Sequence, residues 1–174
     1  MVTAELVRFT RTERALHRIH AIAFVVLLAS GLCLYLPALA EVVGRRGLFK
    51  TIHFYTAVAW LVALLLVVIV GNRKALMALV REVDRFDPRD RAWFRDRTSI
   101  AGRLNAGQKL FTVATAAFAV LFTVTGFLLW YGERDTRFRF ANTLLIHDWV
   151  MYVSAFLFVG HLYMVFRHSR QRNV

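Results

Sequence analysis

The stretch Leu144–Phe166, "LLIHDWVMYVSAFLFVGHLYMVF", is long and apolar enough to cross a lipid bilayer as one helix, yet it contains two histidines. Placing His147 and His161 in hydrocarbon without partners is costly, so histidines at membrane depth indicate a functional site. They are fourteen residues apart, which corresponds to about 21 Å of helix rise and nearly four whole turns. We therefore expect both side chains on one face of one helix, at opposite depths.

The composition is that of a membrane protein. Of the 174 residues, 58% are hydrophobic, and the formal charge of +12 is concentrated in short blocks between apolar runs. A nucleic-acid-binding protein more often interleaves basic and aromatic residues along a helix face, so no nucleic-acid partner is predicted. The single cysteine, Cys33, excludes an intrachain disulfide, a Cys-x-x-Cys-His haem attachment and an Fe–S cluster carried by this chain alone.

Four segments are long enough to span a bilayer, and helix is the only state that satisfies their backbone there. The sequence predicts one all-α membrane domain, an integral four-helix bundle with spans at approximately 15–40, 51–72, 108–132 and 140–166 and a loop at 73–107. Ala38-Leu39-Ala40 resembles a signal-peptide cleavage site. Because the apolar stretch before it is longer than a typical signal sequence, we expect a retained span instead.

The distribution of basic residues predicts the orientation. Seventeen of the 23 Lys and Arg residues lie on the side shared by both termini and the 73–107 loop, and six lie on the other side. The positive-inside rule then places both termini and this loop in the cytoplasm.

The predicted topology places the histidines at two depths. His53 and His147 lie near the outer face, whereas His161 lies near the cytoplasmic face, as do His17 and His20. One bis-histidine site at each depth is the arrangement of a cytochrome that binds two b-type haems, because neutral imidazole is a standard axial ligand. Interhelical hydrogen bonding and a histidine proton relay are the competing interpretations.

Two details stay open at this level. His17 and His20 are three residues apart on neighbouring parts of one face, and either could reach a haem. Gly31, Gly126 and Gly160 would allow a flat macrocycle to approach closely, but simple helix packing explains them equally well.

Four segments resemble the signature regions of the cytochrome b (gamma) subunit of respiratory formate dehydrogenases. They are "ERALHRIHAIAF", "GLFKTIHFYTAVAW", "RLNAGQKLF" and "NTLLIHDWVMYVSAFLFVGHLYMVF". The resemblance covers nearly the whole chain, from about Arg8 to Phe166. It implies a four-helix bundle with two haem b groups, held by His17 with His161 on the inner side and by His53 with His147 on the outer side.

The resemblance also implies a quinone site beside the inner haem, formed by Asn105, Gly107 and Gln108 with His161 close by. Side-chain amides suit this role because they donate hydrogen bonds to quinone carbonyls without adding buried charge. The same residues are also typical of the start of a helix, with Asn105 as the N-cap.

The implied function is electron transfer from an Fe–S subunit on the outer face to the quinone pool, with substrate oxidised on a partner subunit that contains molybdenum or tungsten. A cytochrome b anchor of a hydrogenase, or of another molybdopterin oxidoreductase, is the first alternative. A haem-free histidine-dependent transporter or scaffold is the second. The basic stretch 73–103 is expected to form an amphipathic element on anionic lipid heads or over the quinone site.

Overall fold

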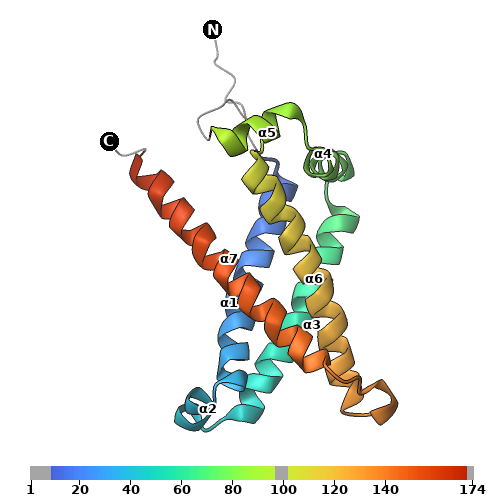
Figure 1. Cartoon of the computed structure of the whole chain (residues 1–174). Coiled ribbons are helices and arrows are strands. Elements are labelled where there is room, and N and C mark those ends of the chain that lie inside the picture. The colour runs from blue at the N-terminus through green and yellow to red at the C-terminus, as the bar shows by residue number, and fades with distance from the viewer. Residues whose placement is uncertain (1–8, 97–101, 172–174) are drawn as a thin grey trace. The chain divides into compact units, whose positions relative to one another are not determined.

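The structure, a computed structural model, describes residues 9–96 and 102–171 and is entirely helical over these ranges (Figure 1). Its elements are α1 (Arg11–Tyr35), α2 (Pro37–Val43), α3 (Arg46–Val70), α4 (Arg73–Asp84), α5 (Pro88–Arg95), α6 (Ala106–Gly132), the 3-10 helix η1 (Thr136–Phe138) and α7 (Thr143–Gln171). Helices α1, α3, α6 and the Thr143–Arg167 part of α7 are long and apolar enough to cross a membrane. This confirms the prediction of an all-α protein with four spans.

The chain forms two compact units, Met1–Asn105 and Ala106–Val174. Each unit is built on one pair of long helices that pack against each other, α1 with α3 in the first and α6 with α7 in the second. We call these the α1–α3 hairpin and the α6–α7 hairpin. Apolar side chains cover their outer surfaces: Phe156 is 77% exposed and Val70 80% exposed. A surface of this kind suits lipid, which is as apolar as the side chains themselves.

The first long helix begins and ends earlier in the chain than the predicted span. The predicted span 15–40 extends past the end of α1, because the chain leaves the helix at Leu36 (φ −86°, ψ 114°). The residue before a proline disfavours helical backbone, and Pro37 then starts the separate helix α2. A residue with left-handed backbone, Gly44 at φ 61°, makes the turn from α2 to α3.

The basic loop contains two short helices, as far as it is described. Helix α4 begins at the N-cap Asn72, whose Oδ1 accepts a hydrogen bond from the Ala75 amide at 3.1 Å. Asp87 and Asp90 form a reciprocal capping box at the start of α5, with Pro88 in its first turn. The expected amphipathic element is therefore helical, and residues 97–101 of the predicted 73–107 loop lie outside the described ranges.

Candidate functional site

In the α1–α3 hairpin, His53 of α3 faces a serine–glycine pair on α1. Its Nδ1 lies 3.0 Å from Ser30 Oγ, and Ser30 is 3% exposed. A Cβ added at Gly31 would lie 3.4 Å from His53 Cε1. The imidazole of His53 therefore lies within van der Waals distance of the position that a Cβ at Gly31 would take.

In the α6–α7 hairpin, His147 of α7 faces a threonine–glycine pair on α6. Its Nδ1 lies 2.8 Å from Thr125 Oγ1, and a Cβ added at Gly126 would lie 3.8 Å from its Cε1. Phe122, one turn earlier on α6, contacts the ring edge to face with centroids 5.1 Å apart. Both predicted outer histidines therefore have the same local environment, a hydroxyl and a glycine on the preceding long helix.

His20 lies among aromatic side chains in the other half of the α1–α3 hairpin. Its ring centroid is 5.6 Å from that of Trp60 on α3 and 6.3 Å from that of Phe24 on α1. Within the described residues, the indole N–H of Trp60 is the buried side-chain donor that has no hydrogen-bond partner. His17 is exposed, so α1 presents the two candidate inner histidines differently.

His161 stacks on an aromatic ring near the start of α6. The Phe111 ring lies 5.0 Å from the imidazole, centroid to centroid, with 16° between the planes. Gln108 precedes Phe111 by three residues on the same helix face. Gly107 and the exposed Gln108 are in the first turn of α6, and the half-buried Asn105 directly precedes that helix. The structure thus brings His161 close to the start of the helix that carries Gly107 and Gln108.

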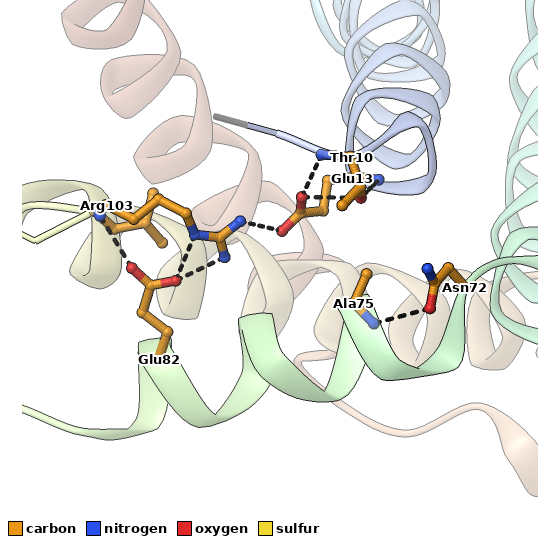
Figure 2. A network of polar contacts seen from close by, with 7 residues as sticks. Thr10, Glu13, Asn72, Ala75, Glu82 and Arg103 are labelled. Atoms are coloured by element: carbon orange, nitrogen blue, oxygen red, sulfur yellow. Dashed lines mark hydrogen bonds and ion pairs between the residues drawn. The ribbon is translucent and has the colours of Figure 1, made fainter. Parts of the chain in front are cut away.

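An ion-pair network in the first unit joins the segment before α6 to α1 and α4 (Figure 2). Arg103 Nη1 lies 2.6 Å from Glu13 Oε1, and its Nη2 lies 2.6 Å from Glu82 Oε2. The Leu104 amide donates to the second oxygen of Glu82 at 3.1 Å. Partial burial alone would lower the pKa of the Arg103 guanidinium, but its hydrogen bonds to Glu13 and Glu82 outweigh this and raise it.

The network also fixes the start of α1. Glu13 Oε2 accepts hydrogen bonds from the amide and the hydroxyl of Thr10, at 2.7 and 2.9 Å, while Thr10 Oγ1 accepts from the Glu13 amide. This is a capping box. One carboxylate therefore caps α1 and binds Arg103, which holds the chain two residues before Asn105.

The sequence analysis missed Ser30, Thr125 and the three members of the ion-pair network. A signal for the first two is present: Ser30-Gly31 precedes His53 by 23 residues and Thr125-Gly126 precedes His147 by 22. The network has no comparable signal, because Glu13 and Arg103 are 90 residues apart.

Comparison of the sequence with known proteins assigns the chain to a family. The family model for prokaryotic cytochrome b561 matches residues 8–174. The chain is 26% identical, over 91% of its length and 77% of theirs, to proteins named "Formate dehydrogenase, cytochrome b556(fdo) subunit" from three strains of Escherichia coli, K12, O6:H1 and O157:H7. No solved structure gives a significant match.

Four helices long and apolar enough to cross a membrane, together with this family match, define an integral membrane cytochrome. The chain belongs to the prokaryotic cytochrome b561 family, whose members bind b-type haem. The resemblance to formate dehydrogenase cytochrome b subunits, read from four short segments, is confirmed by these relatives.

Proposed function

We propose that this protein is the dihaem cytochrome b subunit of a formate dehydrogenase-type complex, and that it passes electrons across the membrane to quinone. The proposal joins the two hairpins into one four-helix bundle. His53 and His147 hold the outer haem; His17 and His161 hold the inner one. When bound, the haems supply one-electron transfer between the two faces of the membrane.

The observation that carries this proposal is a spacing found independently in each hairpin. On α7, His147 and His161 are fourteen residues apart, or about 21 Å of rise. On α1, the level of His53 is marked by its contact with Ser30. His17 precedes Ser30 by thirteen residues, or about 20 Å of rise. Each hairpin therefore carries histidines at two levels, and the separation of those levels agrees.

The same comparison favours His17 over His20 as the inner ligand. His20 precedes Ser30 by ten residues, or about 15 Å of rise, which is about four residues short of the spacing on α7. His20 also packs against Phe24 and Trp60, whereas His17 is exposed.

The residues at the start of α6 have the chemistry of a quinone site. The amides of Asn105 and Gln108 donate hydrogen bonds to carbonyl oxygens without adding buried charge. Gly107 lies between them without a side chain, and Gln108 is exposed in the first turn. His161 stacks on Phe111, one turn further along α6, so the proposed acceptor site lies next to the proposed inner ligand.

The arrangement implies partners on both faces. The basic residues predict cytoplasmic termini, so quinone reduced near Asn105 takes its protons from the cytoplasm. Electrons enter on the opposite face from an Fe–S subunit. The oxidation of formate takes place on a further subunit with molybdenum or tungsten. The relatives are named as cytochrome b556 subunits of a formate dehydrogenase, which supports a complex of this type.

Redox titration of the purified protein tests the proposal. We expect a reduced-minus-oxidised spectrum with b-type bands, two components of different potential and two haems per polypeptide. A quinol analogue should reduce the component of the inner haem. A single haem per chain would refute the pairing, and copurification with nickel hydrogenase subunits in place of molybdenum or tungsten subunits would refute the assignment of the complex.

A further inference from the structure

Ser30 and Thr125 each contact a histidine and two carbonyl groups of their own helix. The longer carbonyl contacts are Ser30 Oγ to Leu27 at 3.2 Å and Thr125 Oγ1 to Phe122 at 3.5 Å. Ser30 Oγ lies 2.7 Å from the Val26 carbonyl oxygen and 3.0 Å from His53 Nδ1. Thr125 Oγ1 lies 2.6 Å from the Leu121 carbonyl oxygen and 2.8 Å from His147 Nδ1. The two hairpins thus repeat one three-atom chain, from carbonyl oxygen to hydroxyl oxygen to ring nitrogen.

The number of hydrogens in this chain decides the direction of each bond. A hydroxyl has one hydrogen to donate, and a carbonyl oxygen can only accept. If Ser30 donated to the ring, two oxygens would face each other at 2.7 Å without a hydrogen between them. The hydroxyl therefore donates to Val26, and the ring nitrogen donates to the hydroxyl. The same count applies to Thr125, where the corresponding oxygens are 2.6 Å apart.

This count places a proton on Nδ1 of each histidine, and the neutral ring with that proton is the tautomer that can bind iron. The remaining ring nitrogen, Nε2, then has the lone pair that an iron ligand requires. Each ring also lies near a glycine, since a Cβ at Gly31 or Gly126 would be 3.4 or 3.8 Å from Cε1, which is ordinary van der Waals distance. The hydrogen bond to Nδ1 restrains the plane in which Nε2 points.

We infer that Ser30 and Thr125 are positioning residues for the outer haem: each accepts the Nδ1 proton of its histidine, which fixes the tautomer and the ring plane and makes Nε2 a stronger donor to iron. The inference rests on the proposed function, since it takes His53 and His147 as the ligands. Such hydrogen bonds to ligating histidines typically change the affinity for the bound metal 10- to 100-fold. A stronger donor also favours ferric iron, so removing either hydroxyl should raise the potential of the outer haem.

The test compares two threonines two residues apart on α6. Thr125→Val removes the hydroxyl that binds His147 and keeps the side-chain volume. Thr123→Val is the matched control: Thr123 Oγ1 makes the same kind of backbone bond, to the Ala119 carbonyl at 2.8 Å. Ser30→Ala makes the corresponding change in the other hairpin, and Thr125→Ser retains the hydroxyl. Haem content, haem affinity and the midpoint potentials of both haems are measured in the detergent-purified protein.

We expect Thr125→Val and Ser30→Ala each to weaken retention of the outer haem about 10-fold or more and to raise its potential. The inner haem should be unchanged, because it lies about 20 Å away along the helices. Thr123→Val and Thr125→Ser should behave as wild type. The inference is overturned if Thr125→Val equals Thr123→Val in both measurements, or if Thr125→Ser shows the full effect of Thr125→Val. Replacing His147 by alanine separates the two claims: an outer haem that survives this change refutes the proposed ligands instead.

Discussion

The two hairpins are alike at one end and different at the other. At the end of the predicted outer ligands, His53 and His147 each meet a hydroxyl and a glycine on the neighbouring helix. At the opposite ends, the α1–α3 hairpin has His20 against Trp60 and the charges of Arg103, whereas the α6–α7 hairpin has His161 stacked on Phe111. The shared end carries the two histidines that we propose as ligands of the outer haem. The dissimilar ends match separate tasks, anchoring the chain and binding a substrate.

The largest expected effect is the loss of a haem when a proposed histidine ligand is replaced. His53→Ala and His147→Ala should abolish the same haem, although the residues belong to different hairpins, because a b-type haem loses an axial ligand in either case. His17→Ala and His161→Ala should abolish the other haem. Haem stoichiometry and redox titration measure this. A different haem lost from His53→Ala than from His147→Ala would break the comparison.

The ion-pair network should be the next most sensitive feature, because it has no counterpart in the α6–α7 hairpin as described. Arg103→Ala leaves Glu13, whose side chain is 5% exposed, without its cationic partner. We expect a loss of about 1.5–3 kcal/mol in the free energy of unfolding, the range for hydrogen bonds to charged groups. Denaturant unfolding in detergent is the measurement, with Ala at the exposed Arg91 as the control.

Arg103→Lys sharpens that result. A lysine is a point charge and cannot satisfy both carboxylates with the planar fork of a guanidinium. We expect it to recover only part of the lost stability. Full recovery would mean that net charge, and not the bridging geometry seen in Figure 2, stabilises this corner.

A smaller effect is expected at the start of α6. Gln108→Leu keeps the volume of the side chain and removes its hydrogen-bond donors, so the KM for a quinone analogue should rise about tenfold, which corresponds to about 1.4 kcal/mol. The haem spectra should not change. Val113→Ala, at an exposed position further along α6, is the control. An unchanged KM would remove Gln108 from the proposed site.

The smallest effect should come from the cap of α1. Thr10→Ala removes one half of the capping box with Glu13 and should cost about 1 kcal/mol of stability. Thr10→Ser should keep most of it, since the hydroxyl is retained. The same unfolding assay applies, and a loss as large as that of Arg103→Ala would show that the cap and the ion pairs act as one unit.

The sequence was sufficient to predict the four long apolar helices, because runs of apolar residues of this length allow only one backbone state in lipid. It was less successful at the end of α1, where the apolar run continues past Pro37 although the proline marks the end of the helix. The pairing of each histidine with a partner from the other hairpin stays a prediction, since it depends on packing between segments far apart in sequence.

The contacts of Ser30 and Thr125 could be predicted only in part. A serine or threonine inside a membrane helix commonly bonds to the carbonyl four residues earlier, and this explains both residues without any histidine. Their contact with a histidine becomes visible only when the packing register of the two helices is known. The pair Glu13 and Arg103 is harder still, because charged residues are common throughout the basic loop and nothing local selects these two.

Helix α7 runs from Thr143 to Gln171 as one continuous α-helix, so His147 and His161 are fixed points on a single rod. Adding or deleting one residue between them would turn one ring by about 100° relative to the other. Substitutions between the two histidines therefore preserve the relative orientation of their rings, whereas insertions and deletions there do not. Engineers who shorten or extend this protein should place their insertions and deletions outside that interval.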